Sequence, residues 1–264
     1  APDGAASARL RRAAALPGAT TAAWTQDLAT GRTAGWNAGS PFPAASTVKL
    51  GVLVAALARA GAAPERSPLA HDLRAMATWS SNLGTNRALA RLGRGSERAG
   101  AALAARALAR IGARSSTFPG GYIVGTELQP ALGPAPATAR PPAVSSRVTT
   151  AQDLARALYA IHAAAAGRRP ALRATGMSPQ AARLALGWLL SSEQRGENRS
   201  LVAGGLPRGT PVAQKNGWIR SARHGAAIAY EPDGARIVVL LTYRAGGVAL
   251  GAAAAAGARV AAAR

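Results

Sequence analysis

The chain has 264 residues, of which 32 are lysine or arginine and 11 are acidic, and it contains no cysteine. This length suits one large domain, or two intimate subdomains, with a sizeable core. The lack of cysteine excludes disulfides and thiolate zinc sites, and three scattered histidines form no metal-ligand pattern, so we expect no metal and no cofactor.

The net charge of +21 suits anionic surroundings such as nucleic acid or cell-wall polymer. The arginines are nevertheless spread along the whole chain, and only 4% of the residues are aromatic. A specific nucleic-acid binder would carry a basic stripe, which this pattern lacks. No apolar run is long enough to span a membrane. We expect a monomeric protein that is secreted or resides in the cell envelope, and any signal peptide is out of view in this chain.

The first part of the chain predicts a helix and a hairpin. Residues 5–15 are basic and alanine-rich, and the strand-like segments 20–26 and 32–36 flank turn residues at 27–31. An apolar helix then begins near Ser46.

This helix carries no charge from Leu50 to Leu57, so we expect most of its faces to be buried. Its first turn places the Ser46 hydroxyl and the Lys49 amine three positions apart, on one face. A desolvated lysine beside a serine activates a weak nucleophile. A serine N-cap followed by a surface lysine is the simpler alternative.

Lysine scarcity favours the chemical interpretation. Lys49 and Lys215 are the only lysines, so the chain uses arginine wherever a positive charge merely solvates the surface. An arginine stays protonated, whereas a lysine amine can give and take protons. Both lysines are therefore candidates for positions where arginine would fail.

The segment after the apolar helix predicts further helices with breaks between them. Residues 71–77 are helical, residues 79–84 interrupt the pattern, and helix resumes near Asn86. Ser96 caps another helix that ends near Gly112.

Residues 115–148 are rich in proline, glycine and serine and predict a long loop, a feature that is usually functional or disordered. Thr150 and Asp153 then form a capping-box-like helix start. Ser178 and Pro179 open the next helix with a cap and a proline at the first helical position.

The C-terminal part predicts strands at 212–216, 226–230 and 236–242, followed by an alanine-rich helix. The turn residues 231–234 join the last two strands. Strands at both ends of the chain, with helices between them, predict an α+β fold whose antiparallel sheet is built from the two termini.

Three short motifs lie where the sheet and the helices would meet. They are Ser46-Thr-Val-Lys49, Ser80-Ser-Asn82 and Lys215-Asn-Gly217. In this order they resemble the S-x-x-K, S-D-N and K-T-G signature of class A β-lactamases and penicillin-binding proteins. The likeness is closest to the class A β-lactamases and covers nearly the whole chain.

The resemblance implies an α/β sandwich beside an all-α lobe, with the site in the cleft between them. We expect one catalytic unit over residues 1–264. Its antiparallel sheet with flanking terminal helices would comprise residues 1–38 and 205–264, and its all-α part residues 39–204.

The resemblance also implies a role for each motif residue. Ser46 would be the acylated nucleophile, Lys49 its proton acceptor or relay, and Ser80 the donor to the leaving nitrogen. Lys215 would attract the substrate carboxylate, and the backbone N–H groups of Ser46 and Trp218 would form the oxyanion hole. The other implied substrate contacts are Asn82, Asn216, Gly217 and His224, the last at a position where the family often has an arginine, with Arg220 or Arg223 as substitutes.

The chain departs from the family pattern in its motifs. Ser81 replaces the aspartate of the second motif, which bears on the stability of that loop more than on chemistry. Asn216 replaces a threonine or serine, and Ser80 follows Ser46 by only 34 positions, which predicts a trimmed cleft wall.

A further departure concerns deacylation. Class A β-lactamases carry a glutamate in an E-x-x-L-N segment that activates the hydrolytic water. Between Glu97 and Asp153 the chain has one carboxylate, Glu127, without the following Leu-Asn. Glu127 is therefore a doubtful deacylation base, and a solvated loop glutamate is the alternative.

We expect a serine hydrolase that forms an acyl-enzyme on Ser46 and hydrolyses β-lactams weakly, with a small-molecule or peptidoglycan-derived acyl substrate. A D-alanyl-D-alanine carboxypeptidase-like or other amide or ester hydrolase is the enzymatic alternative. A cationic binder of cell-wall polymer is the non-enzymatic one, and such a binder would have no reason to retain Ser46, Lys49, Ser80 and Lys215 together.

Overall fold

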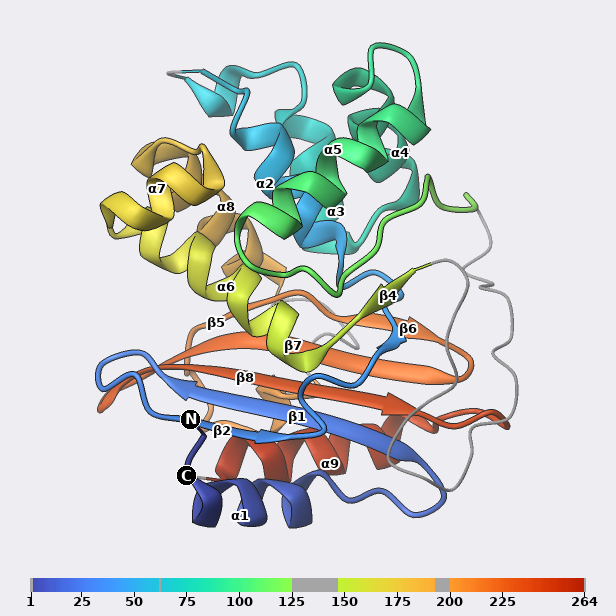
Figure 1. Cartoon of the computed structure of the whole chain (residues 1–264), viewed down its shortest axis with the longest axis vertical. Helices are drawn as coiled ribbons and strands as arrows, with labels where there is room; N and C mark the ends of the chain where they lie inside the picture. Colours follow the sequence, from blue (N-terminus) through green and yellow to red (C-terminus); the bar gives the residue numbers. More distant parts are fainter. Residues whose placement is uncertain (1, 62, 125–146, 193–199, 264) are drawn as a thin grey trace.

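The computed structural model of the chain describes residues 2–61, 63–124, 147–192 and 200–263. Its centre is an antiparallel sheet in the order β2-β1-β8-β7-β5, in which β6 also pairs with β7. Strands from the two ends of the chain lie side by side in this sheet (Figure 1), so the predicted class and the joint contribution of both termini are confirmed. The strands are β1 (Thr20–Asp27), β2 (Thr33–Trp36), β5 (Val212–Gln214), β6 (Gly217–Ile219), β7 (Ala222–Glu231) and β8 (Gly234–Tyr243).

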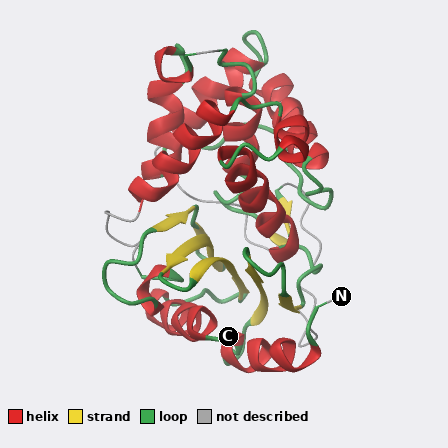
Figure 2. Cartoon of the chain, turned by 90° about the vertical axis from the view of Figure 1, so that its left-hand side faces the viewer, coloured by secondary structure: helices red, strands yellow, loops and turns green. Residues whose placement is uncertain are grey.

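Helices cover both faces of the sheet, which gives the layered arrangement visible in Figure 2. The terminal helices α1 (Gly4–Ala14) and α9 (Leu250–Ala262) pack on one face. The other helices lie toward the opposite face: α2 (Lys49–Leu57), α3 (Ala70–Trp79), α4 (Asn82–Leu92), α5 (Glu97–Arg110), α6 (Ala151–Ala165), α7 (Arg169–Thr175) and α8 (Pro179–Ser191).

Burial on both faces explains the composition of β8. Seven consecutive residues, from Ile237 to Tyr243, are buried, and their only polar side-chain groups are the hydroxyls of Thr242 and Tyr243. A strand covered on one face alternates apolar and polar residues, whereas a strand covered on both faces is apolar throughout. Gly234 closes the β7–β8 turn with a φ of +136°, a conformation that glycine adopts without steric cost.

The apolar helix α2 runs through the middle of the helical layer. All nine of its residues are buried, including Lys49, as its uncharged sequence predicts. A Cβ atom at Gly51 would lie 2.7 Å from Cγ of Leu108 on α5, so the glycine allows the two helices to pack closely. The amine of Lys49 is therefore held inside the protein.

Several element boundaries differ from the sequence predictions, and three of these differences fall at the motifs. Helix α2 begins at Lys49, three residues after Ser46, and α4 begins at Asn82 rather than near Asn86. Strand β5 ends at Gln214, which leaves Lys215 and Asn216 in the connection to β6. Elements that the sequence did not predict are β6, α7 and the two-stranded ribbon of β3 (Phe42–Pro43) with β4 (Val148–Thr149).

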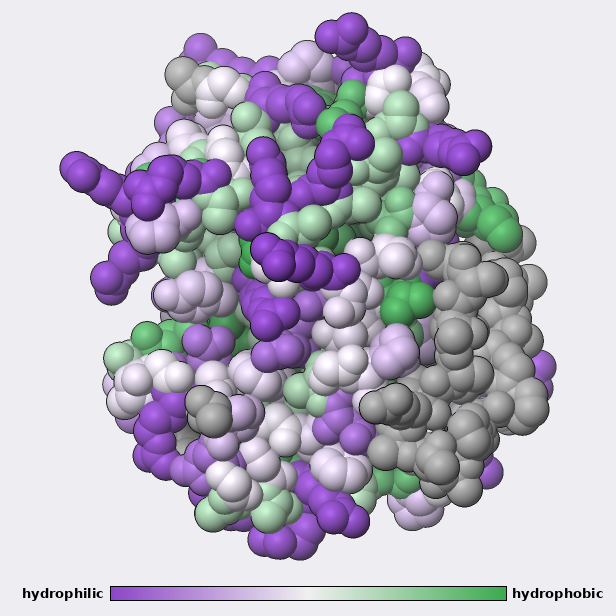
Figure 3. Space-filling view, in the orientation of Figure 1, coloured by the Kyte–Doolittle hydropathy of each residue, from purple (hydrophilic) through white to green (hydrophobic). Residues whose placement is uncertain are grey.

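On the face of the molecule in Figure 3, hydrophilic residues are scattered over both the helices and the sheet instead of forming one stripe. Within the described part of the chain, no helix is long and apolar enough to cross a membrane. No group of three or more described His, Asp or Glu residues could hold a metal ion.

Candidate active site

Ser46 lies in a series of tight turns that leads into α2. The backbone N–H of Lys49 donates to the carbonyl oxygen of Ser46 over 3.2 Å, and the next two N–H groups make the same i to i−3 bonds. Ala45, just before the serine, has a φ of +48°. A residue with a side chain rarely adopts this left-handed region, so the backbone turns sharply at this point. Ser46 is half-buried and lies just before the first residue of α2.

The segment before Ser46 is fixed to the sheet by His224 of β7. The Nε2 atom of His224 lies 2.6 Å from the carbonyl oxygen of Pro43, and its Nδ1 atom accepts from the backbone N–H of Thr242 over 3.2 Å. Because Nδ1 accepts, the proton of the neutral ring resides on Nε2, which donates to Pro43. Burial lowers the pKa of His224 to about 4. The expectation that His224 contacts substrate is wrong, because its side chain is fully buried and both nitrogens bind backbone.

Lys49 reaches the junction of α3 and α4. Its Nζ atom donates to the Ser80 carbonyl oxygen and to Oδ1 of Asn82, each over 2.7 Å, and lies 3.3 Å from Oγ of Ser80. The side chain is 1% exposed. Burial of an amine without such acceptors would be costly, and here oxygen atoms from two residues surround it.

The two consecutive serines of the second motif have different structural roles. Ser80 ends α3 in the left-handed conformation, with a φ of +61°, and its hydroxyl points to the lysines. Ser81 is the N-cap of α4, and its Oγ atom accepts from the backbone N–H of Gly84 over 3.0 Å. A serine at this position supplies a favourable helix cap. The loop that lacks the family aspartate is thus stabilised by Ser81.

Lys215 approaches the same hydroxyl from the sheet. Its Nζ atom lies 2.9 Å from Oγ of Ser80 and 2.9 Å from the carbonyl oxygen of Asn216. Lys215 is 4% exposed, and Asn216 is 2% exposed. Oγ of Ser80 therefore lies within hydrogen-bond distance of both lysine amines, and the three motifs meet at this atom.

Strand β6 passes close to the nucleophile turn. A Cβ atom at Gly217 would lie 2.8 Å from the backbone nitrogen of Ser46 and 2.9 Å from that of Thr47. Only glycine permits this approach without displacement of one backbone. The following residue, Trp218, is half-buried and pairs with Arg223 of β7. The backbone N–H groups of Ser46 and Trp218 thus belong to neighbouring segments.

The remaining predicted site residues differ in their exposure and in their contacts. Arg220 is exposed in the turn between β6 and β7, and Arg223 is half-buried on β7. The Nδ2 atom of Asn82 donates to the carbonyl oxygen of Ile123 over 3.0 Å. Glu127 lies outside the described residues.

Tyr122 lies at the site although no sequence motif predicts it there. Its hydroxyl donates to the carbonyl oxygen of Ala45 over 2.9 Å, and Nζ of Lys49 lies 4.3 Å from the centre of its ring. The composition of residues 115–148 predicts a long loop, but Tyr122 itself matches no motif. Arg147 lies against the same ring, with its Cζ atom 3.8 Å from the ring centre.

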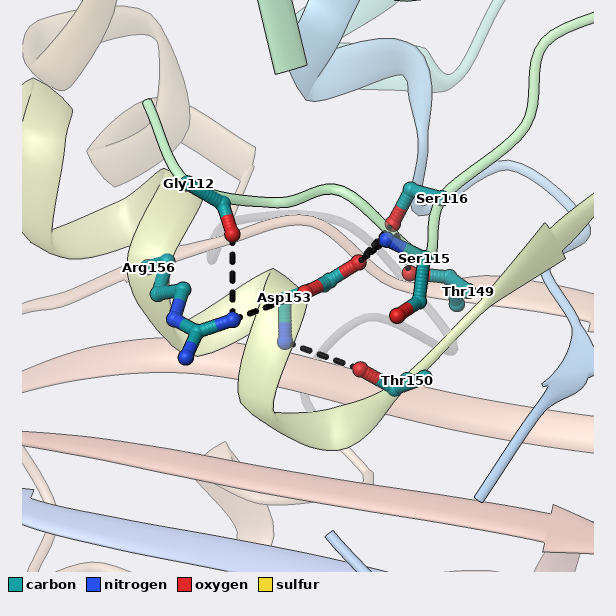
Figure 4. Close-up of polar contacts among 7 residues, drawn as sticks. All are labelled: Gly112, Ser115, Ser116, Thr149, Thr150, Asp153 and Arg156. Atoms are coloured by element: carbon teal, nitrogen blue, oxygen red, sulfur yellow. Dashed lines mark hydrogen bonds and ion pairs between the residues drawn. The ribbon is translucent and has the colours of Figure 1, made fainter. Parts of the chain in front are cut away.

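A buried carboxylate supports the start of this loop (Figure 4). Asp153 accepts from the backbone N–H of Ser115 over 2.8 Å and from Oγ of Ser116 over 3.0 Å, and it lies 3.3 Å from Nη1 of Arg156. Burial is the largest influence on Asp153 and raises its pKa, although each of these contacts acts to lower it. The Ser116 hydroxyl also contacts that of Thr149 over 2.9 Å. These bonds anchor the loop after α5 to β4 and α6.

The sequence of the chain matches a known protein family. A model described as the beta-lactamase enzyme family matches residues 5–66 and 63–263. A search of curated proteins finds no match.

Solved structures of similar shape include two β-lactamases and a penicillin-binding protein. A β-lactamase from Streptosporangium roseum aligns with a TM-score of 0.72 and 19% identity, over 98% of this chain and 98% of the other. A β-lactamase from Sphaerobacter thermophilus aligns with a TM-score of 0.69 and 21% identity, over 97% and 94%. A mutant of PBP-A in an acyl-enzyme complex with penicillin G aligns with a TM-score of 0.71 and 18% identity, over 99% and 96%. At these identities the likeness shows a shared fold.

Proposed function

The chain belongs to the beta-lactamase enzyme family and is a serine hydrolase of that fold, and we propose that its acyl-enzyme forms on Ser46. One observation carries this assignment. Oγ of Ser80 lies within hydrogen-bond distance of Nζ of both Lys49 and Lys215. A continuous route for a proton thus begins at the lysine three residues after the proposed nucleophile.

In the proposed acylation, Lys49 first accepts a proton from Ser46 and then supplies one through Ser80. The Ser46 hydroxyl oxygen forms a bond to the substrate carbonyl carbon. Its proton passes to Lys49, which acts as a neutral amine. When the carbonyl carbon–nitrogen bond breaks, a proton passes through the Ser80 hydroxyl to the leaving nitrogen, and Lys49 restores it. The route is short because Lys49 contacts Ser80 directly.

Charge stabilisation comes from groups on both the helical side and the sheet side of the site. The N–H groups of Ser46 and Trp218 would donate to the developing oxyanion, an interaction that is strong in a water-poor site. The close approach of Gly217 to the Ser46 nitrogen supports this placement. Lys215 would attract the substrate carboxylate, and Asn82 would hold the substrate amide.

The substrate and the setting are also proposals. We propose a β-lactam or a peptidoglycan-derived acyl group as the substrate, met by a monomeric enzyme in the cell envelope or outside the cell. The family and the PBP-A complex with penicillin G support the choice of a penicillin as the first probe. Size-exclusion chromatography with light scattering tests the monomer.

A fluorescent penicillin followed by intact mass spectrometry tests the assignment of the nucleophile. Wild type should gain one covalent label, and Ser46→Ala should gain none. Ser191→Ala is the matched control, because it removes a partly exposed hydroxyl whose hydrogen bond is to a backbone oxygen within α8. Label that persists in Ser46→Ala, or is lost from Ser191→Ala as well, would contradict the assignment.

A further inference from the structure

Tyr122 reaches the peptide unit that contains the nitrogen of Ser46. Its hydroxyl lies 2.9 Å from the carbonyl oxygen of Ala45, the residue immediately before the proposed nucleophile. The side chain is only 5% exposed, and burial raises the pKa of its phenol. The phenol therefore keeps its proton and acts as a donor to the carbonyl oxygen.

The backbone of Tyr122 is itself held in place by Asn86 of α4. Nδ2 of Asn86 donates to the carbonyl oxygen of Tyr122 over 2.7 Å, and Oδ1 of Asn86 accepts from the N–H of Tyr122 over 2.7 Å. The Arg147 guanidinium packs on the tyrosine ring. The hydroxyl is thus positioned by contacts on both the backbone and the ring.

The geometry of a peptide bond links this hydroxyl to the oxyanion hole. The carbonyl of Ala45 and the N–H of Ser46 belong to one planar unit, and in a trans peptide they point in opposite directions. The described peptide bonds include no cis bond. A donor that fixes the oxygen therefore also fixes the direction of the N–H.

This peptide plane follows a residue in a rarely adopted backbone conformation. Ala45 has a φ of +48°, in the left-handed region that a residue with a Cβ rarely adopts. Rotation of the Ala45–Ser46 plane changes ψ of Ala45 and φ of Ser46 and would turn the N–H away from its present direction, and a hydrogen bond to the carbonyl oxygen opposes this rotation. The nitrogen now faces Gly217, next to the other proposed donor of Trp218.

We propose that Tyr122 is a positioning residue whose hydroxyl holds the Ala45–Ser46 peptide plane so that the Ser46 N–H points into the oxyanion hole. This inference rests on the proposed acylation of Ser46. It assigns to Tyr122 no proton transfer and no contact with the reacting atoms.

Tyr122→Phe tests the proposal, because it removes only the hydroxyl and keeps the ring beside Lys49. The measurement is the acylation rate of Ser46 by an activated ester and by the matching thionoester, whose sulfur is a poor hydrogen-bond acceptor. We expect wild type to prefer the ester. In Tyr122→Phe the ester rate should fall about 10-fold and the thionoester rate much less, so that their ratio falls. General loss of structure would slow both substrates alike and leave the ratio unchanged.

Tyr230→Phe is the control, since it removes another tyrosine hydroxyl, which contacts Nδ1 of His162 over 3.1 Å, and should keep the wild-type ratio. If Tyr122→Phe does not fold, Asn86→Ala replaces it, because it keeps the phenol but removes the two bonds that position it. Its ratio should also fall. An unchanged ratio in the folded variant overturns the role of Tyr122 alone. A wild-type protein that is not acylated on Ser46 overturns the proposed function, and this inference with it.

Discussion

The Nζ atom of Lys215 lies 2.9 Å from the Oγ atom of Ser80, although 135 positions separate the two residues. Lys215 follows β5 in the sheet, and Ser80 ends α3 in the helical layer. The contact exists only when the sheet and the helices have packed together. Substitutions at the site should therefore report on chemistry and on this packing, and the two effects need separate measurements.

Lys49→Arg should lower the rate of acylation by about 10² or more, the usual range for lost acid–base catalysis. A guanidinium stays protonated and is larger than the amine that Ser80 and Asn82 surround. Lys215→Arg should be milder, because a guanidinium still attracts a carboxylate. Stopped-flow acylation with a chromogenic penicillin measures both rates, and thermal unfolding verifies that each variant is folded. Equal, negligible effects of the two substitutions would refute the argument from lysine scarcity.

Ser80→Ala and Ser80→Gly form a matched pair that separates chemistry from backbone strain. Both remove the hydroxyl between the lysines, so acylation should fall by a similar factor, on the order of 10² to 10⁴. Because Ser80 has a φ of +61°, the glycine variant should be more stable than the alanine variant by about 1 kcal/mol. Chemical denaturation measures the second difference. A glycine variant that acylates much faster than the alanine variant would mean that strain, not the hydroxyl, controls the rate.

The parts of the fold and site that the sequence predicts are those with local signals. Ser96, Thr150 and Ser178 are helix caps in the structure as their neighbours indicate. The motif residues could be proposed because each motif is short, and the structure brings Lys49 and Lys215 to one hydroxyl. Such patterns depend on only a few neighbouring positions.

The features that the sequence does not predict depend on distant contacts. Tyr122 lies in a loop without periodicity, and its bond to Ala45 spans 77 positions. Helix α2 starts at Lys49, after a turn in which Ala45 is left-handed, a conformation for which alanine gives no signal. The position of His224 after the third motif suggested a ligand contact, but its side chain turns into the core toward Pro43.

His224 should make the protein less stable in mild acid. Its pKa is lowered to about 4 from the ordinary 6.5 because burial disfavours the charged ring. Between these values the unfolded chain binds the proton more tightly than the folded protein does. The contribution of neutral His224 to the free energy of unfolding is therefore complete above pH 6.5. It is lost as the pH falls toward 4, and the total loss is roughly 3 kcal/mol.

His224→Gln tests this dependence, because its amide can still donate to the Pro43 carbonyl but does not titrate. Urea unfolding at pH 4.5 and pH 7 should show a smaller loss of stability for the variant than for wild type. His162, whose pKa is also lowered by burial, remains in both proteins and cancels in the comparison. Equal acid sensitivity of the two proteins would show that His224 does not titrate in this range.

Gly217→Ala should disrupt the nucleophile turn. Its Cβ atom would lie 2.8 Å from the nitrogen of Ser46, so one of the two backbones must shift. A displacement of the reacting group by about 1 Å can lower a rate by about 10², and overpacking should cost about 1–3 kcal/mol of stability. Gly187→Ala is the control: it lies in α8 with no atom within 4 Å of the added carbon, and it should leave acylation unchanged. Comparable acylation rates for the two variants would rule out a close approach of β6 to Ser46.

The acyl-enzyme should persist for minutes or longer, with weak turnover of penicillin. An ester on Ser46 is hydrolysed quickly only if a base activates a water that faces its carbonyl. Tyr122 cannot serve as this base, because burial raises the pKa of its phenol and its O–H donates a hydrogen bond to the carbonyl oxygen of Ala45. Asn82 and Asn86 present amides, which are not bases.

Glu127 lacks the sequence context of the family's base, so Glu127→Gln should change the lifetime of the adduct little. Intact mass spectrometry after a pulse of penicillin measures that lifetime. Rapid clearance by wild type, together with accumulation of adduct in Glu127→Gln, would identify Glu127 as the base and the protein as a competent β-lactamase.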